Sequence, residues 1–297
     1  MASELILSLK KRKNSYGSKI SILSPAKINL YLNIIGKYPS GFHRIESIAE
    51  RVSLFDRIDI EVTKPPHINI SSNIKSLETD ENLCFKAANL AQKKLKIPFG
   101  FNIFLNKNIP IGAGLGGGSS NAASVLLGLN KLLDLKLEKE KLYHLGASLG
   151  SDVNFFLNQS SFAFLEAKGQ KAASLNIERS FKHLIVWPNI PVSTKKVYNN
   201  FKAKLTKNFN NVKILKYALA KGDVSLVKRN VFNILEKETC SVYPKVKKAK
   251  ERFERYGVFL KMSGSGSAFY TICKNTSIRK IRSIVPDRWA VFKVQTF

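Results

Sequence analysis

Cysteine and long apolar runs are scarce in this sequence. The three cysteines, Cys84, Cys240 and Cys273, are far apart and belong to no CxxC or Cys/His spacing. We therefore expect neither a disulfide framework nor a zinc site. The longest apolar stretches fall well short of the roughly 18 residues that a membrane-spanning helix needs, and the N-terminus lacks the apolar block of a signal peptide. A cytoplasmic protein without membrane contact is the resulting expectation.

Acidic residues are also few, and this shortage sets the net charge. The chain has 49 basic and 21 acidic residues, which gives a net charge of +28 at pH 7. Such a charge first suggests an anionic partner such as nucleic acid. However, 38 of the basic residues are Lys and 11 are Arg, spread along the whole chain, whereas base and phosphate readers rely on clustered Arg. We expect a solvated lysine-rich surface and no nucleic-acid partner.

The length of 297 residues favours one large domain or two intimate ones. The hydrophobic periodicity mixes strands and helices, so we expect an α+β protein. The pattern changes near residue 167, which predicts an N-terminal domain over 1–167, with 1–19 a flexible extension, and a C-terminal domain over 168–297. Strands are expected at 20–36 as two short pieces bent at Pro25, and at 57–63, 67–71, 101–106, 161–166, 183–187, 258–262, 268–273 and 289–296. Helices are expected at 81–95, 119–133, 138–149, 194–202, 212–220, 223–229, 233–240, 244–256 and 275–283.

A glycine-rich loop precedes one of these helices. Residues 110–123 read PIGAGLGGGSSNAA, with five glycines in the seven positions from Gly112 to Gly118. Glycine enters left-handed conformations easily, so such a loop can turn several backbone N–H groups toward one anion, and the helix N-terminus adds to the attraction. A polyphosphate is the expected occupant, and a plain hairpin loop is the alternative.

Three known phosphate-binding classes do not fit this loop. Gly112, Gly114 and Gly117 satisfy GxGxxG, but the acidic residue about 20 positions on, Asp134, follows a helical run instead of ending a second parallel strand. A Walker A loop requires Gly-Lys-Ser/Thr, and here Gly117 is followed by Gly118 and Ser119. Protein-kinase HRD and DFG signatures are absent. The loop therefore predicts an ATP site of another class.

Four segments together resemble the GHMP kinases in order and spacing. They are Pro25-Ala26-Lys27-Ile28-Asn29-Leu30, the 110–123 loop, Gly150-Ser151-Asp152-Val153 and Met262-Ser263-Gly264-Ser265-Gly266-Ser267. The resemblance implies ATP and Mg²⁺ as cofactors, with the metal ligands left open. The nucleotide-binding residues that it implies are Pro110, Gly112, Ala113, Gly114, Leu115, Gly116, Gly117, Gly118, Ser119, Ser120 and Asn82. For Asn82, helix capping is the alternative role.

Within this superfamily, the SPAKINL segment followed by Gly41-Phe42-His43 is similar to the branch whose acceptor carries a cytidine diphosphate. The resemblance implies that Phe42 and Tyr198 lie against the pyrimidine ring and that His43 hydrogen-bonds its edge. Core packing is the alternative for the two aromatic residues. The acceptor-binding residues that the resemblance implies are Asn29, Phe42, His43, Tyr198, Gly264, Ser265 and Gly266.

The resemblance also implies a mechanism. Asp152 would accept the proton of the acceptor hydroxyl, and Lys27 would hold that carboxylate ionised and steady the reacting oxygens, because phosphoryl transfer depends on positioning and charge neutralisation. A surface salt bridge is the alternative for this pair. Ser119 and Ser120 would reach toward phosphate or Mg²⁺.

The implied fold has a ribosomal-protein S5 domain 2-like N-terminal domain and a ferredoxin-like C-terminal domain, with the active site between them. The implied reaction is ATP-dependent phosphorylation of the 2-hydroxyl of a cytidine-diphosphate-linked methylerythritol, in the non-mevalonate route to isoprenoid precursors. The alternatives are a mevalonate- or homoserine-type kinase of the same superfamily and a basic RNA-binding protein with an S5-like fold. The oligomeric state is open.

Overall fold

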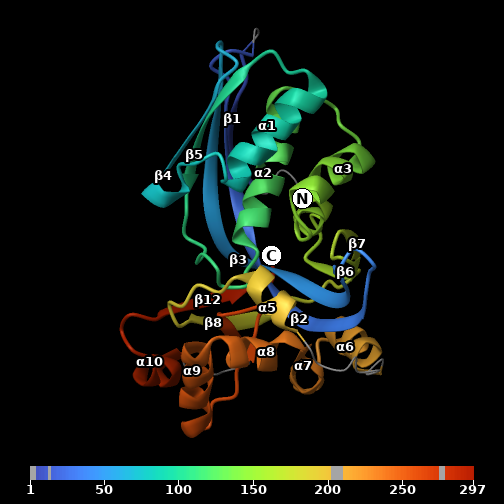
Figure 1. Ribbon diagram of the computed structural model, residues 1–297, viewed down its shortest axis with the longest axis vertical. Helices are drawn as coiled ribbons and strands as arrows, with labels where there is room; N and C mark the ends of the chain where they lie inside the picture. The colour runs from blue at the N-terminus through green and yellow to red at the C-terminus, as the bar shows by residue number, and fades with distance from the viewer. Residues whose placement is uncertain (1–4, 13–14, 202–209, 274–277) are drawn as a thin grey trace. The chain divides into compact units, whose positions relative to one another are not determined.

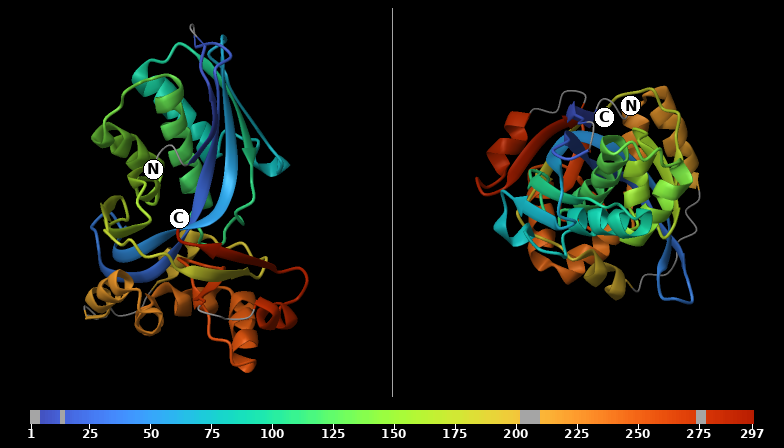
Figure 2. Two further views of the ribbon diagram at one scale, coloured as in Figure 1. Left: turned by 180° about the vertical axis from the view of Figure 1, so that it is seen from behind. Right: turned by 90° about the horizontal axis from the view of Figure 1, so that it is seen from above.

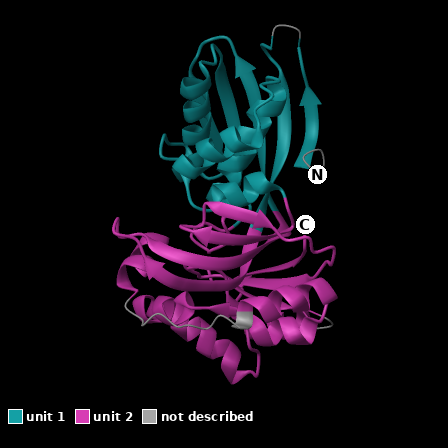
Figure 3. Cartoon of the chain, turned by 90° about the vertical axis from the view of Figure 1, so that its right-hand side faces the viewer, with its two compact units in different colours: residues 1–26, 55–109, 117–159 teal, residues 27–54, 110–116, 160–297 magenta. Residues whose placement is uncertain are grey.

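The computed structural model describes residues 5–12, 15–201, 210–273 and 278–297. The chain forms two compact units that interleave along the sequence (Figure 3). Unit 1 consists of Met1–Ala26, Phe55–Ile109 and Gly117–Gln159, and unit 2 of Lys27–Leu54, Pro110–Gly116 and Ser160–Phe297. The long strands β2 (Lys19–Lys37) and β3 (His43–Thr63) are each divided between the units.

Unit 1 is a twisted sheet with helices packed on one face (Figures 1 and 2). Its strand order is β1-β2-β3-β5-β4. The further strands are β1 (Ile6–Lys10), β4 (Ile68–Ser72) and β5 (Gly100–Asn106), and the helices are α1 (Leu83–Leu95), α2 (Gly117–Leu132), α3 (Lys139–Leu149), α4 (Val153–Asn158) and the 3₁₀ helix η2 (Lys75–Leu77). A Cβ added to Gly128 of α2 would lie 3.2 Å from Cδ1 of Ile60 on β3, so this helix approaches the sheet closely.

Unit 2 contains the remaining parts of β2 and β3 together with β6 (Phe162–Ala167), β7 (Lys171–Ser174) and β9 (Phe232–Asn233). It also has a second, antiparallel sheet in the order β10-β11-β8-β12. These strands are β8 (Lys182–Trp187), β10 (Lys261–Met262), β11 (Phe269–Ile272) and β12 (Ala290–Gln295). The helices are α5 (Thr194–Asn200), α6 (Asn210–Lys221), α7 (Val224–Asn230), α8 (Leu235–Val242), α9 (Pro244–Arg255) and α10 (Ile278–Ile284).

The order of this second sheet confirms the ferredoxin-like topology. The chain passes from β8 through helices to β10 and β11, and then through α10 to β12, which is the βαββαβ arrangement with its first and third strands in the middle. Apolar side chains of the sheet and of α9 and α10 share one core, including Val186, Phe253, Phe269 and Ile281. The expected α+β class is thus confirmed.

Most predicted elements are present, and the differences have physical reasons. Residues 20–36 were expected as two strands bent at Pro25, but β2 is continuous. Strand β1 pairs with β2 only as far as Ile22, and β9 pairs with it only at Tyr31 and Leu32. Pro25 falls between these two partners, so its missing N–H costs no ladder hydrogen bond.

The N-terminal region also differs from the expected flexible extension. Residues 6–10 form β1 and pair with 19–22, whereas residues 1–4 and 13–14 lie outside the described part of the chain. Strand β3 extends back to His43, well before the predicted strand at 57–63. No helix in the described ranges is long and apolar enough to cross a membrane.

Candidate active site

Two motif residues lie on one face of β2 in unit 2. Lys27 and Asn29 are two positions apart, so their side chains share a face of the strand, and both are buried. The Nζ of Lys27 donates a hydrogen bond to Oδ1 of Asn29, and Nδ2 of Asn29 donates to Oγ of Ser47 at 2.8 Å. The lysine ammonium is therefore held by an amide whose own orientation is fixed from β3.

The Ser263–Ser267 loop packs directly against this pair. A Cβ on Gly264 would lie 3.3 Å from Nζ of Lys27 and 3.1 Å from Oδ1 of Asn29. The backbone N–H of Asn29 donates to Oγ of Ser263 at 3.2 Å, and that hydroxyl donates to the carbonyl of Gly114 at 3.0 Å. The structure thus brings the first motif, the first part of the glycine loop and the third motif together within unit 2.

The first part of the glycine loop, residues 110–116, requires its glycines. Gly112, Gly114 and Gly116 have φ of 64°, 75° and 70°, a region that favours glycine. A Cβ on Gly114 would also lie 2.1 Å from the carbonyl oxygen of Ser263. The backbone N–H of Ala268 donates to the carbonyl of Ala113 at 3.0 Å, and that of Lys27 donates to the carbonyl of Leu115 at 3.0 Å. Adjoining backbone therefore fixes the shape of this part of the loop.

The aromatic residues predicted to meet the acceptor also lie in unit 2. The ring centroids of His43 and Tyr198 are 5.4 Å apart, and Phe201 meets His43 edge-on at 5.7 Å. Phe42 is 57% exposed, and Nζ of Lys168 lies 4.2 Å from its ring centroid. An exposed ring beside a cation offers a surface to a flat anionic molecule.

Burial, and secondarily the nearby Lys37 ammonium, lower the pKa of His43 below its usual value. The imidazole is therefore mainly neutral at pH 7, with one nitrogen that donates and one that accepts. A ring in this state can match the mixed donor and acceptor edge of a pyrimidine.

The second part of the glycine loop begins α2 in unit 1, above a buried ion pair. Nζ of Lys107 lies 2.5 Å from Oδ2 of Asp56 and donates to the carbonyl of Ile109 at 2.7 Å. Asn121 of α2 donates to the same carboxylate oxygen at 2.8 Å. A Cβ on Gly117 would lie 2.8 Å from Nζ of Lys107, so a larger residue at this position would require the ammonium to move.

Ser120 belongs to the same hydrogen-bond network, through Ser24 and Asn121. Its hydroxyl is fully buried and accepts a hydrogen bond from Oγ of Ser24 at 2.8 Å. Ser119 is less buried, and a Cβ on Gly150 would be 3.7 Å from its Oγ, so this serine lies beside the segment from Gly150 to Val153. Any contact of either serine with phosphate or Mg²⁺ stays a prediction.

Asp152 and Asn82 occupy helix starts in unit 1. Asp152 is the residue before α4 and makes no side-chain cap to that helix. Asn82 caps α1: it accepts from the N–H of Cys84 at 2.9 Å and donates to the carbonyl of Leu77 at 2.8 Å. The capping role of Asn82 is therefore observed, and its contact with adenine stays a prediction.

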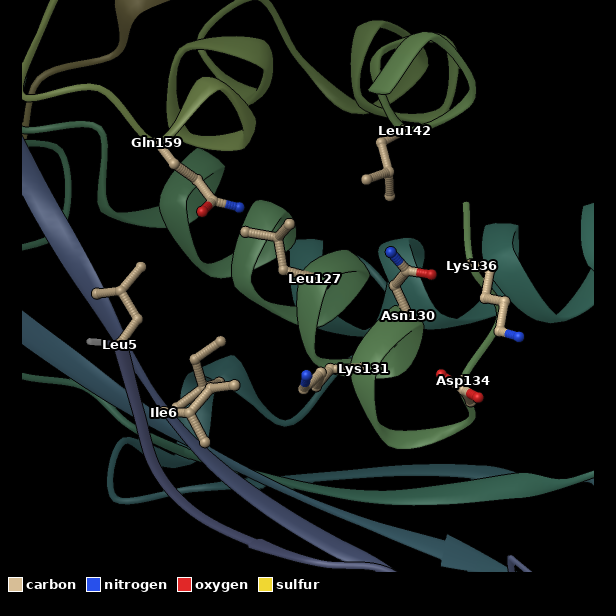
Figure 4. A pocket seen from close by; sticks show the side chains of 10 residues that line it. Leu5, Ile6, Leu127, Asn130, Lys131, Asp134, Lys136, Leu142 and Gln159 are labelled. Atoms are coloured by element: carbon tan, nitrogen blue, oxygen red, sulfur yellow. The ribbon is translucent and has the colours of Figure 1, made fainter. Parts of the chain in front are cut away.

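Unit 1 also contains a cavity of about 440 Å³ that none of the predicted site residues lines (Figure 4). Apolar side chains such as Leu5, Leu127 and Leu142 line it together with the polar Asn130 and Lys131. Leu127, Asn130 and Lys131 belong to the second half of α2, several helical turns beyond the glycine loop. The cavity is thus separate from the glycine loop.

Comparisons with known proteins agree with this geometry. The model of the GHMP kinases N terminal domain matches residues 82–163, and that of the GHMP kinases C terminal domain matches residues 215–291. A 4-diphosphocytidyl-2-C-methyl-D-erythritol kinase of Sulfurihydrogenibium sp. (strain YO3AOP1) is 35% identical over 275 residues, covering 92% of this chain and 98% of the relative. The chain belongs to the 4-diphosphocytidyl-2-C-methyl-D-erythritol kinase family.

Two further members of this kinase family support the assignment. The enzyme of Brevibacillus brevis (strain 47 / JCM 6285 / NBRC 100599) is 34% identical, over 92% of this chain and 96% of its own. A crystal structure of 4-(cytidine 5′-diphospho)-2C-methyl-D-erythritol kinase is 30% identical with a TM-score of 0.75, covering 92% of this chain and 98% of that one. The chain is accordingly an ATP-dependent small-molecule kinase.

Several side chains around this kinase-family site were not predicted from the sequence. Asp56 and Lys107 support the start of α2, and Asn233 and Thr239 contact the backbone of the third motif. Lys107 and Asp56 are 51 residues apart in the chain, and the third-motif partners of Asn233 and Thr239 are 26 to 31 residues away. Of these residues, Lys107 could have been found from the sequence, because it stands three residues before Pro110, at the beginning of the glycine loop.

Proposed function

We propose that this kinase transfers the γ-phosphoryl group of ATP to the 2-hydroxyl of 4-diphosphocytidyl-2-C-methyl-D-erythritol. The convergence of Lys27 and Asn29 with the Gly112–Gly116 turn and with Gly264 carries the proposal. One buried ammonium beside two glycine turns suits a reaction in which charge on a transferring phosphoryl group must be neutralised.

The residues of the glycine loop fit a polyphosphate. Three left-handed glycines turn the loop backbone at alternate positions, and α2, which begins at Gly117, adds the positive end of a 16-residue helix. In this proposal Pro110 and the residues 112–120 bind the ATP phosphates, and Asn82 lies near the base. These groups hold the nucleotide in line without covalent chemistry.

Magnesium would be held mainly through the phosphates. In the part of the chain that the structure describes, no cluster of three or more acidic, histidine or cysteine residues could form a metal cage. Mg²⁺ usually keeps several waters and binds through substrate phosphates, and it would neutralise charge on the β- and γ-oxygens. Ser119 is the protein residue that we propose to reach it.

Asp152 is the proposed base, and it belongs to unit 1, whereas Lys27 belongs to unit 2. The carboxylate would accept the hydroxyl proton as the bond to phosphorus forms, and the ammonium would stabilise the reacting oxygens.

The acceptor would bind through its cytosine and its diphosphate. Phe42 and Tyr198 would stack on the pyrimidine, neutral His43 would hydrogen-bond its edge, and Ser265 and Gly266 would contact the remaining polar groups. Base stacking on an aromatic side chain contributes about 1–3 kcal/mol in nucleic-acid systems. That the protein is cytoplasmic and has no nucleic-acid partner stays a prediction from the composition of the sequence.

A coupled ATP-to-ADP assay across four acceptors tests this function. We expect turnover with the cytidyl substrate and at least about 100-fold lower kcat/KM with mevalonate, homoserine and galactose, because these lack the stacked base. Replacement of His43 by Ala serves as the matched variant, since it should raise the KM of the cytidyl acceptor and leave that of ATP nearly unchanged. Preference for an acceptor without a nucleotide would refute the substrate assignment.

A further inference from the structure

One face of helix α8 presents polar side chains to the backbone of the third motif. Asn233, Glu236 and Thr239 are three residues apart, so they follow one side of the helix and the residues before it. Nδ2 of Asn233 donates to the carbonyls of Met262 and Gly264, both at 2.8 Å. These two bonds fix the peptide plane before Ser263 and the one after Gly264.

The other two residues extend the same contact. Oε2 of Glu236 accepts from the N–H of Met262 at 3.0 Å, and Oγ1 of Thr239 donates to the carbonyl of Ser265 at 3.0 Å. Nζ of Lys250 lies 2.6 Å from the second carboxylate oxygen of Glu236 and compensates its charge. Thr239 is fully buried, so its hydroxyl cannot exchange its partner for solvent.

The loop held in this way touches both ends of the proposed acceptor site. Gly264 packs against the Lys27–Asn29 pair, as described above. At the other end, Oγ of Ser265 lies 2.8 Å from Oγ1 of Thr194. Thr194 is the first residue of α5, the helix that carries Tyr198. A shift of the loop would therefore move the lysine environment relative to the aromatic residues.

We propose that Asn233, Glu236 and Thr239 are positioning residues for phosphoryl transfer, an inference that rests on the proposed function. They set the conformation in which Gly264 leaves room for the Lys27 ammonium and Ser265 reaches α5. They act through the loop backbone and touch neither substrate. Misplacement by about 1 Å can cost roughly 100-fold in rate, so this contact sets kcat.

A single substitution separates this role from helix capping. Oδ1 of Asn233 accepts from the N–H of Leu235 at 3.0 Å, which caps α8, whereas Nδ2 holds the loop. Asn233→Asp keeps an acceptor for the cap and replaces the donor by an oxygen that faces two carbonyls. The cap survives and the loop is repelled.

Asn230→Asp is the matched control. Asn230 is 9% exposed, and its Nδ2 donates to the carbonyl of Leu226 within α7 at 2.8 Å. The control therefore loses an amide–carbonyl hydrogen bond in the same unit without touching the loop. Steady-state kinetics and thermal unfolding are measured on both variants, on the wild type and on Lys27→Ala.

We expect Asn233→Asp to lower kcat by about 10- to 100-fold at a temperature where the variant is folded, with a smaller change in the KM of ATP. Asn230→Asp should keep near-normal kcat even if its melting temperature falls equally. A normal kcat in folded Asn233→Asp, or an equal loss in the control, overturns the inference.

A second variant covers the case in which Asn233→Asp does not fold. Thr239→Val keeps the buried volume and removes only the donor to Ser265, so kcat should fall by about 5-fold; unchanged kcat in that folded variant also overturns the inference. The proposed function fails separately, if the wild type does not phosphorylate the cytidyl substrate or if Lys27→Ala retains turnover.

Discussion

At the scale of single residues, Asp152 separates catalysis from binding. If its carboxylate accepts the hydroxyl proton, Asp152→Asn keeps the size but removes the basic charge, so turnover should fall by about 10²- to 10⁴-fold. ATP binding should survive, because the proposed phosphate cradle is built from backbone groups. Steady-state rates measure the loss of turnover, and calorimetry measures whether ATP binding is retained.

Asp134→Asn provides the control for this substitution. Asp134 lies just after the end of α2 in unit 1 and has φ of 52°, which asparagine tolerates, and we assign it no role in the reaction. Lys27→Ala should lower turnover as well, and the Asp152→Asn, Lys27→Ala double variant should lose less than the two effects added in free energy. Near-normal turnover in Asp152→Asn would remove the assignment of the base, and lost ATP affinity would indicate a structural role.

At the scale of elements, the start of α2 depends on the buried Lys107–Asp56 pair. Burial lowers the pKa of Lys107, and the Asp56 carboxylate opposes that shift. Lys107→Met leaves the carboxylate buried without its cation, which typically costs about 3–5 kcal/mol of stability. The free energy of unfolding in denaturant measures this loss.

Lys86→Met is the matched control, because it breaks the exposed pair between Lys86 and Glu81, whose side chains are 40% and 86% exposed. An exposed pair is worth about 0–1 kcal/mol. If both variants lose the same stability, the buried pair does not support α2 in the way the structure suggests.

Elements differ in how well the sequence predicts them. Helix α1 was predicted nearly to its ends, because an Asn cap and small buried residues at helical spacing are local signals. Strand β9 has two residues and exists only because it pairs with Tyr31 and Leu32, about 200 positions earlier. No local sequence pattern predicts such a strand.

The same distinction applies to the site. The glycine loop and the lysine motif were recognisable, because their residue types are tied to phosphate chemistry at fixed spacing. The contacts of Asn233 with Met262 and Gly264 were not, because they join a side chain to backbone carbonyls 29 and 31 residues later. A carbonyl carries no residue type that a sequence can reveal.

At the scale of the whole molecule, the comparisons establish the family of the chain but do not test its domain boundary. The family models match residues 82–163 and 215–291, so the boundary proposed at residue 167 stays a prediction.

The net charge of +28 comes mostly from lysines. Many of these lie on outer helical faces, as Lys245, Lys247 and Lys248 of α9 do. Such a surface raises the local concentration of any anion, whether substrate or nucleic acid.

Salt dependence distinguishes these partners, because non-specific binding to nucleic acid depends on counterion release. We expect RNA to bind only weakly at physiological salt, with Kd of roughly 10⁻⁴–10⁻⁶ M and a steep loss as salt rises. Unrelated single-stranded DNA is the control and should bind equally well, since scattered lysines read no bases. Filter-binding titrations, run beside the ATP-to-ADP assay, measure both activities on one preparation. Nanomolar affinity for RNA together with no phosphoryl transfer would favour an RNA-binding protein. A kinase whose positive surface only attracts its anionic substrates should instead show turnover in the assay and weak binding to RNA.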